Sequence, residues 1–323
     1  MSQIVYDAAY EQELSKYFDE KLPEKIYDAH FHLNRAYTQK CGYPGAPFEQ
    51  YSEFTEKYIC RPISGGMVMP SPRPREILAD ENAYNLSVAE EKGLAAGLII
   101  TPEYGRDATE KKLDTYSQIK VLKPYLTYAR SENLVEADLL DFAPEWMWEL
   151  AHDREMPILI HLSHYQNMLN EEINWRQIRQ MCGKYPKAKL ILAHCAMGHH
   201  VHKLKLGLLH IIDLPNIWFD CSGSAEALSI YYCLKAFGVK RMMYGSDFNH
   251  GATVGRICSF GSNFIGFHEG YINKEAVPSV YQYQPLNNAQ ECMLALLQAI
   301  ELLNLTQKDI EKIFYDNAAE MFA

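Results

Sequence analysis

Short apolar runs of strand length recur along the chain and alternate with stretches of helical periodicity. The eight runs cover residues 25–33, 64–69, 95–101, 120–127, 157–163, 189–195, 216–222 and 241–247. Their near-continuous apolarity is typical of parallel strands that are covered on both faces. Residues 145–155, 175–184 and 225–237 carry the intervening helical pattern, whereas the run at 95–101 could equally extend the helix before it. The alternation predicts an α/β fold.

Eight strand–helix units favour a closed (β/α)8 TIM barrel over an open doubly wound sheet. No GxGxxG motif follows the first run, which counts against dinucleotide binding, and 323 residues suit one barrel domain. Two segments fall outside the repeat. An amphipathic helix is expected at about residues 5–19, and a long connection follows the eighth strand at about residues 248–285. Since that connection leaves the carboxyl end of a strand, we expect it to lie over the barrel mouth as an active-site insertion.

Composition excludes several classes of protein. The chain is 48% hydrophobic and 22% charged, which is ordinary for a folded globular protein. Its net charge of −10 and the lack of any basic run argue against a nucleic-acid partner. No stretch has the length of a membrane span and the first residues do not resemble a secretion signal, so we expect a cytoplasmic protein that acts on a small molecule.

Cysteine and tryptophan positions add two smaller expectations. The eight cysteines form no CxxC pair and no tight spacing, so neither a disulfide framework nor a catalytic thiol is expected. Trp146 and Trp148 lie two apart on a predicted helix and cannot share one face. One of them is therefore a candidate for a subunit contact in a homo-oligomer.

Histidines and a carboxylate stand at the ends of four predicted strands. His30 and His32 lie two apart in the first strand, so both point to the same face. His161 ends the aliphatic run of the fifth strand, His194 that of the sixth, and Asp247 ends the eighth. Only barrel closure brings the eighth strand beside the first, so the topology and the ligand chemistry support each other. Histidine is the commonest metal ligand, and the pattern predicts a divalent-metal site.

The order of these motifs resembles the amidohydrolase superfamily: His-x-His, a histidine after the fifth strand, another after the sixth, and Tyr-Gly-Ser-Asp after the eighth. The closing Asn-Ala-x-x-x-Phe at residues 317–322 resembles the amidohydrolase-related (amidohydrolase 2) branch, which includes enzymes similar to aminocarboxymuconate semialdehyde decarboxylase. The resemblance implies that His30, His32, His161 and Asp247 hold one divalent metal, usually zinc, with manganese, iron or cobalt as alternatives. A water on such a metal has its pKa lowered from about 15.7 towards 7.

The catalytic candidates are Asp247, which can accept the proton of the attacking water, and His194, which can polarise a carbonyl or move a proton. The alternative for Asp247 is a cap on the following turn, and for His194 a structural hydrogen bond. Binuclear members of the superfamily bridge two metals with a carbamylated lysine from the fourth strand, where this chain has Lys120 and Lys123. The alternative for such a lysine is a substrate contact or an exposed charge.

Arginines follow several predicted strands, and a guanidinium group binds a carboxylate with two parallel hydrogen bonds. Arg35 and Arg73 are the first choices as substrate anchors, with His164 as a further contact, although each could be a solvated surface residue. We therefore expect an enzyme, a metal-dependent hydrolase of a C–N or C–O bond in a small carboxylate-bearing amide, lactone or ester. A non-oxidative decarboxylase or hydratase, which is a lyase, is the alternative within the family. A non-catalytic metal-binding barrel protein is the alternative from another class.

Overall fold

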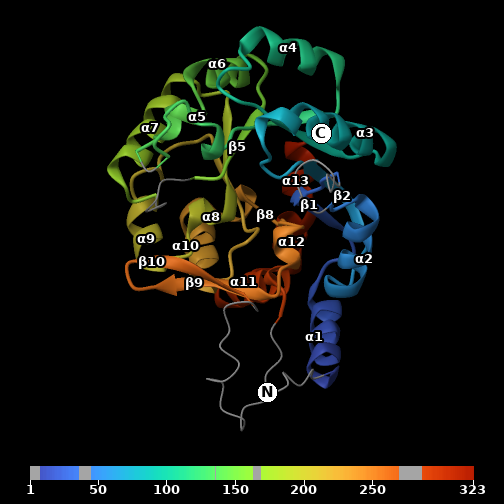
Figure 1. Ribbon diagram of the computed structural model, residues 1–323. Helices are drawn as coiled ribbons and strands as arrows, with labels where there is room; N and C mark the ends of the chain where they lie inside the picture. The colour runs from blue at the N-terminus through green and yellow to red at the C-terminus, as the bar shows by residue number, and fades with distance from the viewer. Residues whose placement is uncertain (1–7, 36–44, 135, 163–168, 269–285) are drawn as a thin grey trace, which may run out of the picture.

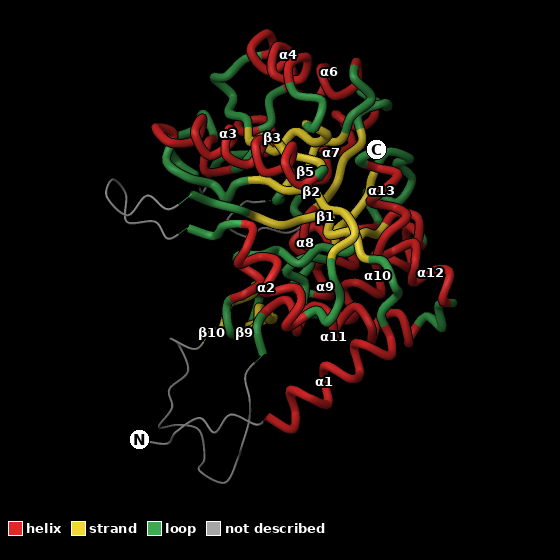
Figure 2. Tube along the Cα trace, turned by 90° about the vertical axis from the view of Figure 1, so that its right-hand side faces the viewer, coloured by secondary structure: helices red, strands yellow, loops and turns green. Residues whose placement is uncertain are grey.

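Eight parallel strands form the centre of the protein and follow one another in chain order around a single sheet (Figure 1). The structure is a computed structural model that describes residues 8–35, 45–134, 136–162, 169–268 and 286–323. The strands are β1 (Ile26–His32), β2 (Ile63–Met69), β3 (Ala95–Ile99), β4 (Ile119–Lys123), β5 (Pro157–Ile160), β6 (Lys189–Leu192), β7 (Ile217–Asp220) and β8 (Met242–Met243). Helices surround them, as Figure 2 shows, and this arrangement confirms the predicted (β/α)8 TIM barrel.

The helices alternate with the strands. They are α1 (Ala8–Lys21), α2 (Phe48–Tyr58), α3 (Arg75–Lys92), α4 (Arg106–Thr115), α5 (Leu139–Phe142), α6 (Glu145–Asp153), α7 (Glu172–Lys184), α9 (Val201–Leu208), α10 (Ala227–Phe237), α11 (Asn288–Leu302), α12 (Gln307–Glu311) and α13 (Asn317–Met321). The segment labelled α8 (Ala193–Met197) has left-handed backbone angles and is a turn rather than an α-helix. Residues 95–99, which the sequence left open between helix and strand, form β3.

The first and last strands meet through the chain that follows β8. The amide of Ala29 donates to the carbonyl of Tyr244 at 2.9 Å, and the amide of Asp247 donates to the carbonyl of His30 at 2.8 Å. The strand β8 ends at Met243, earlier than the predicted end at residue 247. Residues 244–247 leave the regular strand pairing because they bend to contact β1. This bend brings Asp247 to the histidines of β1.

Alternate residues of each strand fill the inside of the barrel and pack against the surrounding helices. Val121, Leu159, Ile191 and Met243 form an inner cluster, which is closed at one end by residues of α13 and by Phe322. Leu122, between two inward-facing residues of β4, belongs instead to the outer core shared with the helices. The side chain of Lys123, next along β4, is fully buried. The closed end leaves the opposite, carboxyl end of the strands for a site.

The connection after β8 contains an antiparallel hairpin that the sequence did not predict, β9 (Gly255–Phe260) and β10 (Asn263–His268). It lies beside α11 and near α9 in Figure 1, and the hydroxyl of Ser259 donates to the carbonyl of His199 at 2.7 Å. Residues 269–285 of the expected insertion lie outside the described part of the chain. The helix expected near the N-terminus is α1.

The tryptophans of α6 and the cysteines lie as follows. Trp148 is fully buried and its indole N–H donates to the carbonyl of Ala143 at 3.0 Å, whereas Trp146 is half-buried. Every cysteine among the described residues is free. In the described ranges no helix is long and apolar enough to cross a membrane.

Candidate active site

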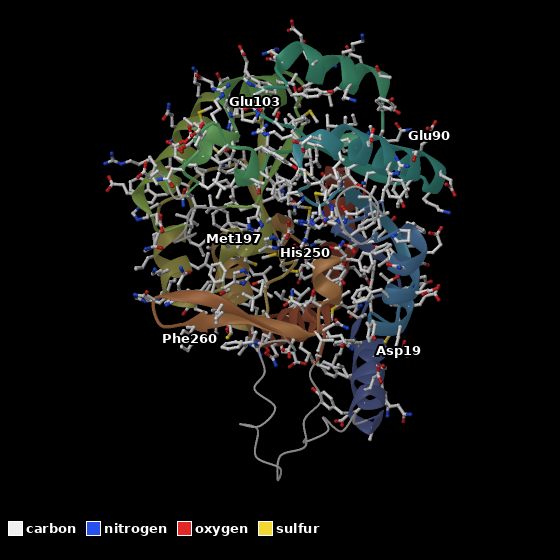
Figure 3. The ribbon with its side chains drawn as sticks, in the orientation of Figure 1. Asp19, Glu90, Glu103, Met197, His250 and Phe260 are labelled. Atoms are coloured by element: carbon white, nitrogen blue, oxygen red, sulfur yellow. The ribbon has the colours of Figure 1, made fainter. Side chains whose placement is uncertain are left out.

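A cavity of about 410 Å³ opens at the carboxyl ends of the strands. Five histidines supply most of its polar lining: His32, His161, His194, His199 and His250. Its apolar walls come from Tyr125, Leu126, Met197 and Ile257, the last of these from the β9–β10 hairpin. Met197 and His250 lie near the middle of the molecule in Figure 3, whereas Phe260 lies at the end of the hairpin. The hairpin thus contributes Ile257 to the wall of this cavity.

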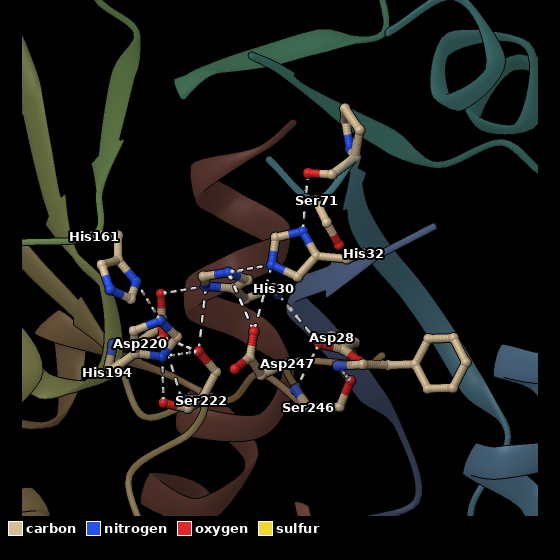
Figure 4. Close-up of polar contacts among 12 residues, drawn as sticks. Asp28, His30, His32, Ser71, His161, His194, Asp220, Ser222, Ser246 and Asp247 are labelled. Atoms are coloured by element: carbon tan, nitrogen blue, oxygen red, sulfur yellow. Dashed lines mark hydrogen bonds and ion pairs between the residues drawn. The ribbon is translucent and has the colours of Figure 1, made fainter. Parts of the chain in front are cut away.

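Three of the histidine rings are held by acceptors at their Nδ1 atoms (Figure 4). His30 Nδ1 lies 3.0 Å from an Asp220 carboxylate oxygen, and His32 Nδ1 lies 3.0 Å from the carbonyl of Pro70. His194 Nδ1 lies 2.7 Å from the carbonyl of Ser222. Because these partners only accept, each Nδ1 carries the proton, and a neutral ring then has a free lone pair on Nε2. Burial lowers the pKa of His30, and lowers that of His32 to about 3, so both rings are neutral at pH 7.

The free Nε2 atoms of β1 converge on Asp247. His30 Nε2 and His32 Nε2 are 3.2 Å apart, and they lie 3.7 and 3.4 Å from Asp247 Oδ1. Two lone pairs that face each other at this distance without a proton repel, so the arrangement suits a cation. Zinc bonds of 2.0–2.1 Å place the ligands of a tetrahedron about 3.3–3.4 Å apart. The three atoms therefore have the spacing of one face of a zinc coordination sphere.

Asp247 is ionised in this setting. Burial alone would raise the pKa of its carboxyl, but the neighbouring imidazoles, that of His194 most strongly, hold that pKa well below its ordinary value. Its backbone is left-handed, with φ of 54°, and Gly245 lies two residues before it. A Cβ at Gly245 would lie 2.8 Å from that of His30, so only glycine allows this close approach.

The buried carboxylate of Asp28 holds the same loop. It accepts hydrogen bonds from the amide of Ser246 at 2.9 Å, the amide of His30 at 3.1 Å and the hydroxyl of Tyr51 at 3.0 Å. Burial raises the pKa of Asp28 to about 6. Its contacts join α2, β1 and the residue before Asp247, which fixes where that carboxylate stands.

His161 and His194 form a second pair beside the first. His194 Nε2 lies 3.1 Å from His161 Nδ1. Among the described residues, His30, His194 and Asp247 have ligand atoms that all lie within 4.8 Å of one another. His194, expected beside the metal, is thus within reach of a shared ion, and His161, expected as a ligand, lines the same cavity beside it. The structure brings together all five residues that the sequence singled out.

Asp220 is a site residue that sequence reasoning missed. It ends β7, is 1% exposed, and contacts both His30 and the backbone of His194. Ser222, two residues later, is also fully buried, and its hydroxyl lies 3.2 Å from His30 Nδ1 and 3.0 Å from His194 Nδ1. A polar residue at the end of an apolar strand is the pattern that identified His161 and His194, and Asp220 has the same position in its strand. Its strand contains no histidine, and for that reason the sequence did not single it out.

The two lysines of β4 lie in different surroundings. The Lys120 amine donates to the Ala323 carbonyl at 2.9 Å, near α13 at the closed end of the barrel and away from the site. The Lys123 side chain is fully buried inside the barrel, 4.7 Å from the centre of the Tyr125 ring. Burial lowers the pKa of Lys123 to about 8, and its amine has no hydrogen-bond partner among the described residues. Of the two, only Lys123 is placed near the histidines.

The predicted substrate anchors are not in the main cavity. Arg35 is exposed, and its amide donates to the Glu81 carboxylate at 3.2 Å. Arg73 lines a neighbouring cavity of about 440 Å³, which shares Pro72 and His250 with the main one. His164 lies outside the described residues. Among the described lining residues of the main cavity there is no lysine or arginine.

A (β/α)8 barrel with imidazole and carboxylate ligands gathered at the carboxyl ends of its strands has the architecture of a barrel enzyme built around a divalent metal. The family model Amidohydro_2, described as amidohydrolase, matches residues 27–323, and the chain belongs to this family. It is therefore an enzyme of a metal-dependent family, and the buried group of His30, His194 and Asp247 is the feature that fits a metal.

Solved structures share the fold over nearly the whole chain. An amidohydrolase from Burkholderia multivorans has a TM-score of 0.63 and 11% identity, over 92% of this chain and 98% of that one. A 4-oxalomesaconate hydratase from Rhodopseudomonas palustris has a TM-score of 0.60 and 14% identity, over 92% and 95%. A 5-carboxyvanillate decarboxylase from Sphingomonas paucimobilis has a TM-score of 0.55 and 10% identity, over 93% and 99%. No curated protein matches by sequence.

Proposed function

We propose that this enzyme is a zinc-dependent hydrolase that cleaves a C–N or C–O bond in a small carboxylate-bearing amide, lactone or ester. The observation that carries the proposal is the triangle of His30 Nε2, His32 Nε2 and Asp247 Oδ1, with sides of 3.2, 3.4 and 3.7 Å, beside the cavity. Neutral imidazoles and one carboxylate suit zinc. The Burkholderia multivorans amidohydrolase, in a second crystal form with a TM-score of 0.57, holds zinc.

His30, His32 and Asp247 would hold the ion, with His161 as the further ligand. A divalent metal supplies a Lewis acid there and lowers the pKa of water towards 7. The second Asp247 oxygen faces Gly223, where a side chain is absent, and can accept a proton from a water in the cavity. His194, whose Nδ1–H is held by Ser222, presents an Nε2 lone pair that can take up a proton and pass it to the leaving group.

The neighbouring cavity supports a carboxylate on the substrate. Because the two cavities share Pro72 and His250, a substrate with its reacting bond beside Asp247 can extend past His250 towards Arg73. A guanidinium–carboxylate hydrogen bond contributes about 1.5–3 kcal/mol, or roughly 10–100-fold in affinity. Arg73→Gln should therefore raise KM by about this factor with little change in kcat. Arg35→Gln, the matched control on the exposed surface, should leave KM unchanged.

A non-oxidative decarboxylase or hydratase is the second candidate, because the same acid–base pair can move a proton without cleaving an amide or ester. A hydratase and a decarboxylase with this fold support it. Product analysis separates the reactions. We would screen carboxylated amides, lactones and enol acids in ¹⁸O-labelled water, with zinc-loaded protein. Cleavage with one ¹⁸O in the product supports the hydrolase, carbon dioxide release without ¹⁸O in the remaining product refutes it in favour of a decarboxylase, and water addition without cleavage indicates a hydratase.

A further inference from the structure

One buried carboxylate contacts the segments that carry both kinds of histidine. Asp220 Oδ2 accepts from His30 Nδ1 at 3.0 Å. Asp220 Oδ1 accepts from the amide of His194 at 3.1 Å, from the amide of Ser222 at 3.1 Å and from the hydroxyl of Ser222 at 2.5 Å. Four donors thus share one carboxylate, three of them on Oδ1 and one on Oδ2, so the two oxygens act on different parts of the site.

The Oδ2 contact determines which nitrogen of His30 carries the proton. An ionised carboxylate only accepts, so His30 must keep its proton on Nδ1, and its Nε2 is left bare towards His32 and Asp247. With the other tautomer, a proton would stand in the 3.2 Å gap between His30 Nε2 and His32 Nε2. That proton would occupy the place of a cation.

The Oδ1 contacts act on His194 through the backbone. Residues 194–197 have φ values of 55°, 51°, 59° and 54°, a left-handed run that is unfavourable for residues with a Cβ. The bond from the His194 amide to Asp220 holds the start of this run. The same carboxylate fixes Ser222, whose carbonyl accepts from His194 Nδ1 at 2.7 Å. The position of the His194 ring therefore depends on Asp220 at two points.

We propose that Asp220 is a positioning residue that selects the Nδ1-protonated tautomer of His30 and, through Ser222 and the turn at residues 194–197, orients His194. One carboxylate at the end of β7 thereby prepares a metal ligand from β1 and a proton carrier from β6 together. The metal part of this inference rests on the proposed zinc site, whereas the tautomer part does not.

Asp220→Asn gives a sharp test because it changes one oxygen only. Three donors, two of them backbone amides, keep the remaining amide oxygen in the Oδ1 position, so the new NH₂ group faces His30 Nδ1. His30 can then accept there only by moving its own proton to Nε2. We expect a folded protein with a thermal midpoint close to that of the wild type, and a zinc affinity lowered about 10–100-fold, the range found when a hydrogen bond to a metal ligand is lost.

The tautomer is read directly by ¹⁵N NMR of histidine-labelled, metal-free protein, with His30 assigned by comparison with His30→Gln. The wild type should show Nδ1–H and Asp220→Asn should show Nε2–H. An Nδ1–H signal in the variant, or zinc affinity within threefold of the wild type by competition with a chelator, would overturn the proposal. Wild-type protein that binds no zinc would refute the proposed function, while the metal-free NMR comparison would still decide the role of Asp220.

Asp138→Asn is the matched control. It also replaces an aspartate whose carboxylate accepts from two backbone amides, those of Leu140 at 2.9 Å and Asp141 at 3.2 Å, but Asp138 stands at the start of α5 and takes no part in the proposed site. Its zinc affinity should stay within about threefold of the wild type. An equal loss in both variants would contradict the tautomer argument, because it would show that loosening of the scaffold is enough.

Discussion

His32→Ala is the most direct perturbation of the proposed metal site. It removes one corner of the triangle, the Nε2 atom that lies 3.2 Å from His30 Nε2 and 3.4 Å from Asp247 Oδ1, and leaves the other two corners in place. It also leaves the Pro70 carbonyl without its donor and opens space around a buried ring, so the metal-free variant should be less stable. The informative quantity is therefore the rise in Tm on adding zinc, measured for each protein against its own metal-free form.

The size of that rise follows from linkage. Zinc at 100 times its Kd stabilises the folded state by about 2.7 kcal/mol. Unfolding entropy of about 2.1 cal/mol/K per residue, over 323 residues, amounts to about 0.7 kcal/mol/K, so Tm should rise by about 4 °C. If the variant binds at least about 100-fold more weakly, the same zinc concentration gives at most about 0.4 kcal/mol, which is less than 1 °C.

Differential scanning calorimetry at matched free zinc measures both increments. His202→Ala, on the exposed face of α9, is the control for loss of a histidine elsewhere and should keep the full increment. Elemental analysis of protein prepared without chelators should find about one equivalent of metal in the wild type and in His202→Ala, and none in His32→Ala. If zinc raises the Tm of His32→Ala by an amount within 1 °C of the rise in the wild type, His32 is not a zinc ligand.

Three further predictions test other parts of the structure. Asp247→Asn should lower turnover of any substrate found by the screen by at least about 100-fold, in steady-state assays at saturating zinc, since it neutralises the proposed metal ligand and proton acceptor. Trp148→Ala should lower the free energy of unfolding in urea by about 3–5 kcal/mol, because it empties a fully buried position; a loss below 1 kcal/mol would contradict this packing. Burial lowers the pKa of Lys123 from 10.5 to about 8. The buried ammonium therefore destabilises the folded protein fully below about pH 8, and this destabilisation disappears as the pH rises from 8 to 10.5. Metal-free Lys123→Met should therefore be more stable than the wild type by about 3 kcal/mol at pH 7, with the difference vanishing near pH 10.5.

The strands were predictable because both faces of each are covered, which leaves an apolar run in the sequence. The gathering of these histidines and Asp247 was predictable for a related reason: in a parallel barrel, polar residues at strand ends share one rim. His30 and His32 come from a single strand, so their common direction needed no tertiary information. Asp247 needed only closure of the barrel.

What the sequence did not reveal depends on contacts between distant segments. Residues 193–197 continue the apolar run of β6 in the sequence, whereas the turn there is held by contacts with β7 and the residues after it, such as the bond from the His194 amide to Asp220. The β9–β10 hairpin is not predictable in this way, because its glycines interrupt the strand pattern and favour a connection. Arg35 and Arg73 both follow strands, yet one is exposed and the other lines a cavity, because loop paths are set by what each loop packs against.

The meeting of β1 with residues 244–247 has a consequence for how the protein acquires its site during folding. Asp247 is made about two hundred residues after His30 and His32, so a chain whose synthesis has not yet reached Asp247 can hold at most part of the proposed ligand set. Tight metal uptake should then appear only once the two ends of the barrel have joined. In a refolding experiment, zinc binding would mark the final closure of the barrel rather than its initial collapse.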